Sequence, residues 1–372
     1  MSWNSSKQTV TSSSVTSARA LMKLRTSSRF AAASFSRKSP PRLKYPCAEN
    51  VRFLKCLRMS PRTFAATSSP AQPAPLTKKI LTADHPTWCP GCGDFAVLAA
   101  YYRVLERLQY PHQNIVTMAG IGCSSRFPYF VNTHGVHYIH GRALPFAAGV
   151  SLGRDDLHVF VFGGDGDGFS IGGNHLVHTG RKNVRMTYVI MDNFVYGLTK
   201  KQTSPTSPLG FRSKTDPTGA LDQPINPMRT LVNSGASFVA RSHATQVNHM
   251  IEMMERAARH DGFSVVEILS ECVEFYEGAF DAAIPRKGGQ FRVVEERKND
   301  GTPEDELRHD SSDELAAYRL ASQPWPGVFG VFYEVKRPTK NRLEADLIAK
   351  AREKTKSAGD LELLQSSFRR LR

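Results

Sequence analysis

Two apolar segments that each end in a polar turn are the feature that most restricts the fold of this 372-residue chain. Residues 157–162 are almost continuously apolar and lead into the glycine-rich turn 163–168, while residues 184–191 are also apolar and end at Asp192 and Asn193. Strands that are apolar on both faces are typical of parallel sheets covered by helices on both sides. Helical patterns between these strands therefore predict an α/β fold with a doubly wound, mainly parallel sheet.

The other periodic segments extend this pattern. Apolar residues at helical spacing predict helices, and short apolar runs before glycine or polar turns predict further strands. A polar loop, 197–230, is long enough to indicate a functional role. The predicted helices span 94–108, 142–152, 170–179 and 246–259, and the additional strands 115–118, 136–139 and 264–269.

Charge divides the chain unevenly. The net charge is +15, but residues 1–80 contain 15 Lys or Arg and one acid, Glu49, so the remainder is close to neutral. We interpret residues 1–79 as a disordered basic leader, either transit-like or lying upstream of a start at Met59. We expect residues 80–292 to form the folded domain and 293–372 a charged, helical C-terminal extension.

This distribution excludes several functional classes. The basic charge belongs to the leader, so the body does not have the charge of a nucleic-acid-binding protein. No apolar run reaches the roughly 20 residues that span a bilayer, so we expect no membrane association. We expect a cytoplasmic protein, or one of an organelle matrix if residues 1–58 are a transit peptide. Cys47 and Cys56 in the leader are interpreted as incidental.

The turn 163–168 indicates a site for an anion and a cation. Asp165 lies between two glycines at a strand end, and the following helix points its amino end at the same place, where a diphosphate is favoured. A carboxylate beside a diphosphate requires a hard cation such as Mg²⁺ between them. Asn193 follows the next strand and can add an oxygen ligand. A structural turn capped by Asp165 explains that residue but not Asn193; Asp167 fits either a cap or the site.

Four cysteines in the body, Cys89, Cys92, Cys123 and Cys272, supply the thiolates that a [4Fe–4S] cluster needs. A structural zinc site takes the same number of ligands, so the residues alone leave both possibilities open.

Six motifs in order resemble the β subunits of 2-oxoacid:ferredoxin oxidoreductases, most closely the two-subunit type that includes 2-oxoglutarate:ferredoxin oxidoreductases. The match covers about residues 80–290, and the combination is far more specific than any one motif. The motifs are Trp88-Cys-Pro-Gly-Cys-Gly-Asp94, Gly120-Ile-Gly-Cys123, His140-Gly-Arg-Ala-Leu-Pro145, Gly164-Asp-Gly-Asp-Gly168, Asp192-Asn193 and Tyr196-Gly-Leu-Thr-Lys200.

The resemblance implies roles for particular residues. It implies that Asp165, Asn193 and the Val195 carbonyl bind Mg²⁺, that the four body cysteines hold a [4Fe–4S] cluster, and that Lys200 contacts a substrate carboxylate. The implied thiamine diphosphate contacts are Ile121, Gly122, Cys123, Ser124, His140, Gly141, Arg142, Ala143, Gly166, Asp167, Gly197 and Leu198.

The resemblance also implies a reaction and partners. These enzymes decarboxylate a 2-oxoacid on thiamine diphosphate, pass electrons singly through the cluster to ferredoxin and transfer the acyl group to coenzyme A. We expect 2-oxoglutarate as the substrate, with pyruvate next. About 210 matched residues leave no room for the domain that activates the cofactor, so a separate α subunit is expected. Two alternatives are a non-redox thiamine decarboxylase relative with a structural zinc and a scaffold subunit without chemistry.

Overall fold

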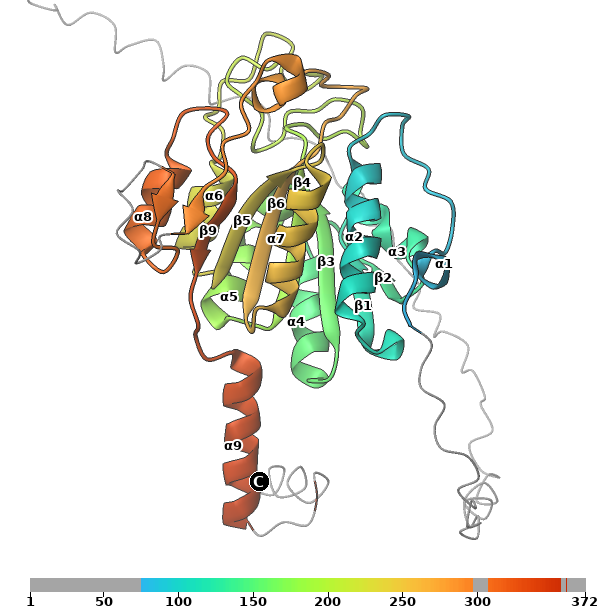
Figure 1. Ribbon diagram of the computed structural model, residues 1–372, viewed down its shortest axis with the longest axis vertical. Coiled ribbons are helices and arrows are strands. Elements are labelled where there is room, and N and C mark those ends of the chain that lie inside the picture. Colours follow the sequence, from blue (N-terminus) through green and yellow to red (C-terminus); the bar gives the residue numbers. More distant parts are fainter. Residues whose placement is uncertain (1–74, 297–306, 356–358, 360–372) are drawn as a thin grey trace, which may run out of the picture. The chain divides into compact units, whose positions relative to one another are not determined.

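A seven-stranded sheet forms the centre of the computed structural model, which describes residues 75–296, 307–355 and 359. The strand order is β2-β1-β3-β4-β6-β5-β9, and every neighbouring pair is parallel except β5 and β9. In Figure 1 the parallel strands end at a set of loops, and β9 runs in the opposite direction. The bounds are β1 Ile115–Ala119, β2 His134–His137, β3 His158–Gly164, β4 Met186–Asp192, β5 Phe238–His243, β6 Phe263–Leu269 and β9 Gly330–Glu334.

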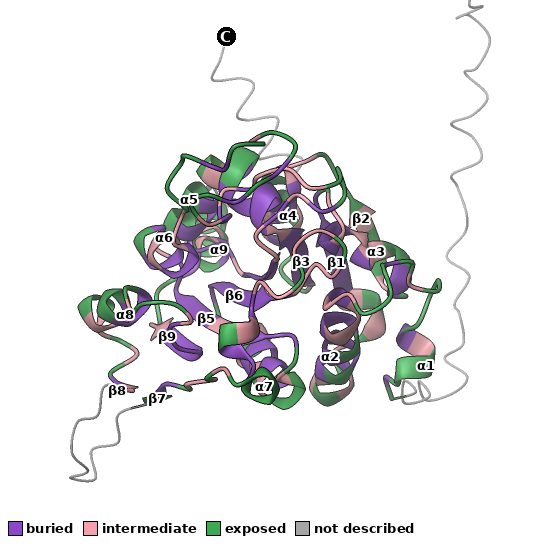
Figure 2. Cartoon of the chain, turned by 90° about the horizontal axis from the view of Figure 1, so that it is seen from above, coloured by how far each residue is buried: buried purple, intermediate pink, exposed green. Residues whose placement is uncertain are grey.

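Helices cover both faces of this sheet. One apolar core joins the sheet to α2, α3 and α7, and a second joins it to α4, α5, α6 and α8. Figure 2 shows the inner strands of the sheet as buried and the outer sides of the helices as exposed. These helices are α2 Asp94–Leu108, α3 Phe127–Phe130, α4 Ala143–Gly153, α5 Gly173–Lys182, α6 Pro227–Asn233, α7 Val247–Arg259 and α8 Glu314–Ala321.

The remaining elements lie outside these two layers. A short pair of parallel strands, β7 Glu295–Glu296 and β8 Arg308–His309, forms a separate sheet. The helix α1, Lys78–Leu81, precedes the sheet, and α9, Lys340–Thr355, extends away from it (Figure 1). In the described part of the chain, no helix combines the length and apolar character needed to cross a bilayer.

The predicted fold class is confirmed, because the sheet is mainly parallel and covered on both faces. The predicted strands and helices correspond to β1, β2, β3, β4, β6, α2, α4, α5 and α7, with boundaries shifted by a few residues. Two strands of the central sheet, β5 and β9, were not predicted, and neither was the separate pair β7 and β8. β5 is interrupted by Arg241 and His243, and β9 lies in the expected charged extension but pairs antiparallel with β5.

Residues of the predicted leader lie mostly outside the described residues, as do Cys47 and Cys56. Within residues 75–79 of that leader, Leu76 is buried and accepts a hydrogen bond from the Gln109 side chain through its carbonyl. The predicted loop 197–230 contains turns and the bridge between Tyr196 and Gln202, and ends in α6 from Pro227. The irregular part of this loop therefore ends before Pro227, whereas the prediction extended it to residue 230.

Candidate functional site

The glycine-rich turn and the Asp192-Asn193 turn meet at the carboxyl edge of the sheet. β3 and β4 are parallel neighbours, and Gly164 at the end of β3 is paired with Met191 near the end of β4. Asp165 and Asp192 are the next residues along the two chains, so they lie side by side at this edge. The Thr206 hydroxyl lies 2.7 Å from Oδ2 of Asp165 and 2.9 Å from Oδ1 of Asp192. A residue from the polar loop thus joins the two strand ends.

Asp165 and Asp192 are buried carboxyl groups that disfavour each other's charge. Burial raises the pKa of Asp165 to about 6, against hydrogen bonds from Ser204 and Thr206 that lower it. Burial, followed by the charges of Asp165 and Glu267, raises the pKa of Asp192 well above its ordinary value. Thr206 has one hydroxyl proton for the two carboxyl groups, and within the described residues Oδ2 of Asp192 has no hydrogen-bond partner.

The turn after β4 folds Val195 back toward Asn193. Oδ1 of Asp192 accepts a hydrogen bond from the Phe194 N–H at 3.0 Å, and Oδ1 of Asn193 accepts one from the Val195 N–H at 3.1 Å. Phe194 adopts φ 60°, which is unusual for an aromatic residue. Its ring packs against Phe280 and Trp325, with centroids 4.8 and 5.5 Å away. Packing thus holds a strained backbone at the site.

Asp167 joins three separate segments through one oxygen atom. Its Oδ1 accepts hydrogen bonds from the Ile121 N–H at 3.0 Å and the Gly141 N–H at 2.7 Å, and lies 2.7 Å from Nδ1 of His140. Asp167 is itself buried. Three of the four segments expected to contact thiamine diphosphate are therefore held together by a single carboxylate.

Two glycines of the site, Gly166 after β3 and Gly120 after β1, have no room for a side chain. A Cβ at Gly166 would overlap the ring of Tyr196, and a Cβ at Gly120 would overlap the Asp167 carboxylate. The helical segment here begins at Gly166, four residues earlier than predicted, as one π-helical turn, Gly166–Ile171, that precedes α5. Such turns are rare and occur frequently at functional sites.

The other expected cofactor contacts differ in their surroundings. Ser124 is buried near Gly164, whereas Leu198 and Ile121 have exposed side chains. The Arg142 guanidinium donates to the carbonyls of Gly141 and Ile171. Three more positions complete this set: Gly122 at φ 138°, Ala143 buried at the start of α4, and buried Gly197 in the loop after β4.

Four cysteines from three segments lie near this edge. Cys89 and Cys92 precede α2, Cys123 follows β1, and Cys272 follows β6; all four are free thiols. A Cβ at Gly197 would lie 3.4 Å from Sγ of Cys272 and 3.8 Å from Sγ of Cys123. The structure therefore brings Cys123 and Cys272 to the same loop that carries predicted cofactor contacts.

The cysteines also lie within electrostatic reach of one another. Burial, then the charges of Asp94, Cys272 and Cys89, raises the pKa of Cys123 to about 11. Burial also raises the pKa of Cys92 and of Cys272, and neighbouring cysteines add to both effects. Negative charge on these thiols is therefore disfavoured without a cation or a metal cluster between them.

The thiols do not converge on a single point. Within residues 75–296, 307–355 and 359, no three His, Cys, Asp or Glu side chains are close enough together to hold one metal ion. A tetrahedral zinc site requires four sulfurs about 2.3 Å from one centre. A four-iron cluster takes its four thiolates on different iron atoms, so it does not require the four sulfurs to share one centre.

Lys200 lies on an exposed hairpin between Tyr196 and Gln202. Lys200 and Lys201 both adopt φ 68°, a left-handed conformation that favours glycine. The Nζ atom of Lys201 lies 5.5 Å from the centre of the Phe211 ring. The hairpin therefore places two consecutive strained lysines beside the site.

Three residues of the site were missed by sequence reasoning. Thr206 and Ser204 belong to the polar loop, whose length was the only signal of function. Asp94 follows the Cys-x-x-Cys segment; it is buried, accepts a hydrogen bond from the Ser270 hydroxyl at 2.7 Å, and burial raises its pKa to about 6. No spacing rule connects Asp94 with Ser270, because they lie 176 residues apart.

Comparison with known proteins is consistent with this geometry. Residues 116–268 match the family of the thiamine pyrophosphate enzyme, C-terminal TPP binding domain. The 2-oxoglutarate synthase subunit KorB of Archaeoglobus fulgidus is 41% identical over 185 residues, which cover 50% of this chain and 69% of that protein. The chain belongs to the β subunits of 2-oxoacid:ferredoxin oxidoreductases.

Two further relatives extend this family assignment. The 2-oxoglutarate oxidoreductase subunit KorB of Mycobacterium tuberculosis is 43% identical over 242 residues, which span 65% of each chain. The 2-oxoacid:ferredoxin oxidoreductase subunit beta of Saccharolobus solfataricus is 43% identical over 187 residues, covering 50% of this chain and 61% of that subunit. The chain thus matches less than two thirds of the length of both these family members.

A solved structure of the family has the same fold. The 2-oxoglutarate:ferredoxin oxidoreductase from Magnetococcus marinus, with 2-oxoglutarate, coenzyme A and succinyl-CoA bound, matches with a TM-score of 0.67 and 38% sequence identity. The match covers 78% of this chain and 94% of the other chain. The β-subunit fold is therefore present over most of the chain.

Proposed function

We propose that this β subunit takes part in the oxidative decarboxylation of a 2-oxoacid, with coenzyme A as acyl acceptor and ferredoxin as electron acceptor. 2-Oxoglutarate is the favoured acid, because it is named in the relatives from M. tuberculosis and A. fulgidus and in the solved structure; pyruvate is next. The decisive observation is that Cys123 and Cys272 both lie against Gly197. A redox centre held by these thiols would adjoin the cofactor loop, which couples decarboxylation to electron transfer.

The oxygen atoms at the strand ends fit Mg²⁺ and a diphosphate. Asp165 offers a carboxylate, Asn193 an amide oxygen and Val195 a carbonyl, and these hard ligands are the kind that Mg²⁺ prefers. A divalent cation would also offset the repulsion between Asp165 and Asp192, which now share the Thr206 hydroxyl. In this proposal, Asp165, Asn193 and Val195 bind the ion, and Thr206 orients the Asp165 carboxylate toward it.

Thiamine diphosphate, when bound, supplies a carbon nucleophile and an electron sink for decarboxylation. The residues of this chain position that cofactor. Asp167 holds the segments containing Ile121, His140 and Gly141 in one arrangement, and Gly166 lets the backbone approach closely. We place the cofactor against the full set inferred from the motifs, namely Ile121–Ser124, His140–Ala143, Gly166, Asp167, Gly197 and Leu198.

A [4Fe–4S] cluster is the metal group that the cysteines fit best. Cys89, Cys92, Cys123 and Cys272 come from three segments, and Cys123 and Cys272 lie against Gly197, where a redox group would adjoin the cofactor and a structural zinc has no evident role. Cys89 is exposed, while the other three are half-buried. An electron acceptor would therefore approach the cluster from the side of Cys89.

Partners complete the proposed enzyme. The subunit names of the relatives support an α subunit, and we expect this chain to be inactive without it. Lys200 has an exposed side chain on the hairpin beside the cofactor loop, and we propose it as a contact for a substrate carboxylate. The intact carboxylate and thiol sets disfavour a scaffold without chemistry.

Metal analysis and turnover test this proposal together. We would purify the chain and its α subunit anaerobically, measure iron and zinc, and record EPR spectra after dithionite reduction. About four irons per chain, a reduced-state signal and dye reduction that requires 2-oxoglutarate and coenzyme A are expected. Zinc in place of iron, or no metal in a folded complex, would reject electron transfer through these cysteines.

A further inference from the structure

Phe194 lies between the two magnesium ligands proposed in the turn after β4, Asn193 and Val195, and adopts φ 60°. Its N–H donates to Oδ1 of Asp192, and its carbonyl accepts a hydrogen bond from the Ser207 hydroxyl at 2.6 Å. The backbone angles of Phe194 set the direction of Asn193 relative to Val195. A change in the conformation of Phe194 would therefore move the two ligands out of their present arrangement.

Three aromatic rings meet at this turn. The ring centre of Phe194 lies 4.8 Å from that of Phe280 and 5.5 Å from that of Trp325, and the centres of Phe280 and Trp325 are 6.0 Å apart. These distances are within the range of favourable aromatic pairs. Phe280 is fully buried, whereas Trp325 is 45% exposed. Removal of the Trp325 ring should therefore take a contact from Phe194 without leaving a closed cavity in the core.

Trp325 comes from the C-terminal part of the chain, outside residues 80–292 in which the sequence predicted the folded domain. It lies in the loop between α8 and β9, and both ends of this loop are bonded to other segments. The Ser322 hydroxyl accepts a hydrogen bond from Nε of Arg229 at 2.9 Å, and the Phe329 carbonyl accepts one from the Val294 N–H at 2.7 Å. The loop thus holds Trp325 against the turn from a fixed base.

A left-handed backbone is unfavourable for an aromatic residue, so contacts of the surrounding structure must hold it. We propose that Trp325 is a positioning residue that, through Phe194, keeps Asn193 and Val195 in the arrangement that binds Mg²⁺ with thiamine diphosphate. The inference rests on the proposed function, because Asn193 and Val195 are magnesium ligands only in that proposal.

The test uses the full chain in complex with its α subunit. Trp325→Ala removes the ring, and Trp325→Phe keeps a smaller one. Tyr318→Ala is the matched control, because Tyr318 is also 45% exposed and its ring lies 5.7 Å from the Arg229 guanidinium in α6, away from the turn. Calorimetry measures the affinity for thiamine diphosphate in Mg²⁺ and in EDTA.

Loss of one aromatic pair should weaken the affinity measured in Mg²⁺ by about two- to tenfold in Trp325→Ala. The loss should be smaller in Trp325→Phe, and Tyr318→Ala should leave the affinity unchanged. Trp325→Leu, which keeps apolar bulk without an aromatic ring, replaces Trp325→Ala if that variant does not assemble with the α subunit.

A double-mutant cycle tests whether Trp325 acts through Phe194. In a Phe194→Ala background the ring that Trp325 contacts in the turn is absent, so Trp325→Ala should add no further loss of affinity. Losses that multiply in the double variant would overturn the proposal, because Trp325 would then act on the site independently of Phe194.

Iron content and unfolding separate positioning from a general structural role. Iron content should be unchanged in Trp325→Ala, and its urea midpoint should fall no further than that of Tyr318→Ala. Equal affinity in the wild type and Trp325→Ala, or an equal loss in EDTA and in Mg²⁺, would overturn the proposal. A loss of iron together with cofactor affinity would also overturn it, because Trp325 would then support the fold.

Two further outcomes distinguish this inference from the proposed function. Mg²⁺-dependent binding that requires Trp325, in a complex that does not oxidise 2-oxoacids, would reject the proposed reaction and retain the inference. Turnover of 2-oxoglutarate in the wild type, with the same affinity and Mg²⁺ dependence in Trp325→Ala, would retain the proposed function and reject the inference.

Discussion

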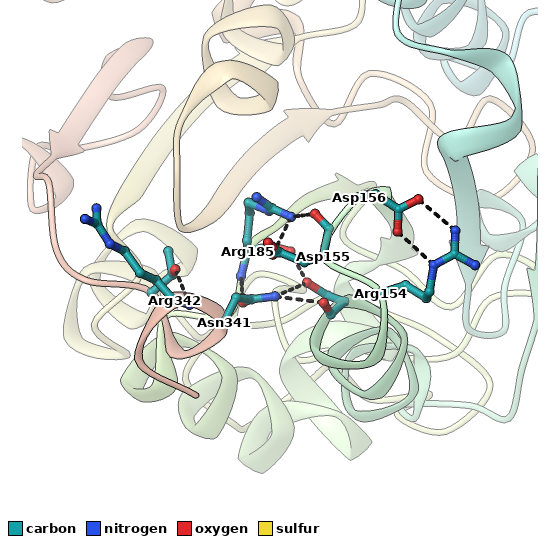
Figure 3. Close-up of polar contacts among 8 residues, drawn as sticks. Arg154, Asp155, Asp156, Arg185, Asn341 and Arg342 are labelled. Atoms are coloured by element: carbon teal, nitrogen blue, oxygen red, sulfur yellow. Dashed lines mark hydrogen bonds and ion pairs between the residues drawn. The ribbon is translucent and has the colours of Figure 1, made fainter. Parts of the chain in front are cut away.

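The two edges of the central sheet are built from the same residue types but differ in how their charges are satisfied. At the carboxyl edge, Asp165 and Asp192 are buried, and Thr206 supplies one proton to two acceptors. At the amino edge, Arg185 pairs with Asp155 and Arg154 with Asp156, all partly or largely exposed (Figure 3). Buried carboxyl groups with raised pKa values lie at the carboxyl edge, and such groups are typical of ligand-binding sites.

Left-handed residues other than glycine occur at both edges, since Gln109 and Asn183 at the C-caps of α2 and α5 precede strands at the amino edge. Phe194, Lys200 and Lys201 adopt left-handed conformations, and all lie in the segment after β4 at the carboxyl edge. At the amino edge, the buried Asn341 side chain accepts a hydrogen bond from the Arg185 N–H and donates to the Ser151 carbonyl (Figure 3). Both polar groups of the Asn341 side chain thus have hydrogen-bond partners, which connect the start of α9 to the residue before β4 and to α4. The left-handed residues at the two edges differ in kind, because Gln109 and Asn183 are helix C-caps, where a left-handed residue is common, whereas Phe194, Lys200 and Lys201 lie in a loop.

Of the substitutions considered at the two edges, the loss of the Asp165 carboxylate should have the largest effect. Asp165→Asn should weaken binding of thiamine diphosphate with Mg²⁺ by about a thousandfold, because the ion loses its only carboxylate among the proposed ligands. Calorimetry on the full chain in complex with its α subunit measures the change. Affinity within threefold of the wild type would show that another group binds the ion.

The second-largest effect should be on how the free energy of unfolding depends on pH. Folding raises the pKa of Asp165 from 3.8 to about 6, so the folded state holds its proton more tightly than the unfolded state. The protonated Asp165 therefore adds to the free energy of unfolding below pH 4. This contribution, about 3 kcal/mol, is lost as the pH rises through 6.

Urea unfolding of the cofactor-free chain between pH 4 and 7.5 tests this, with the Asp165→Asn variant as the control. The wild type should lose stability relative to the variant as the pH rises, and Mg²⁺ with thiamine diphosphate should restore it at pH 7.5. A constant difference between the two proteins across this range would contradict the raised pKa.

Thr206→Val should have an intermediate effect. It removes the hydroxyl between two buried carboxyl groups without changing the shape of the side chain, so we expect a loss of about 2 kcal/mol in the free energy of unfolding. Thr206→Ser keeps the hydroxyl and should lose less than half as much. Equal losses in both variants would attribute the effect to the methyl group.

At the amino edge, Asn341→Ala should cost about 1–2 kcal/mol, because it leaves the buried Arg185 N–H and Ser151 carbonyl without this partner. Arg154→Gln serves as the exposed comparison and should leave the midpoint of denaturant unfolding unchanged. Neither change should alter cofactor affinity. A weaker affinity in Asn341→Ala would mean that the two edges are coupled.

The smallest expected effect is a gain. Lys201→Gly relieves a left-handed conformation that glycine adopts freely and should stabilise the chain by about 1 kcal/mol. The same change at an exposed helical lysine, Lys350 in α9, should destabilise it by a similar amount. Destabilisation by Lys201→Gly would show that the contact between Lys201 and Phe211 outweighs the strain.

Sequence patterns predicted the parts of the fold in which local signals are strong. Continuous apolar runs identified β3, β4 and β6, and helical spacing identified α2 and α7. β5 was missed because Arg241 interrupts its apolar pattern, yet the charge is paired with Glu267 across β6 at a 2.5 Å contact. β9 was missed because five residues carry too little periodicity to distinguish a strand from a charged extension.

The sequence by itself determined which chemical groups this protein has: four thiols, a carboxylate between glycines, and an asparagine after the next strand. It also determined that parallel strands deliver Asp165 and Asn193 to one edge, because strand direction follows from the alternation with helices. Only the tertiary structure decided the partners of these groups. Thr206 and Ser270 reach the site through loops, whose paths depend on packing between residues far apart in the chain.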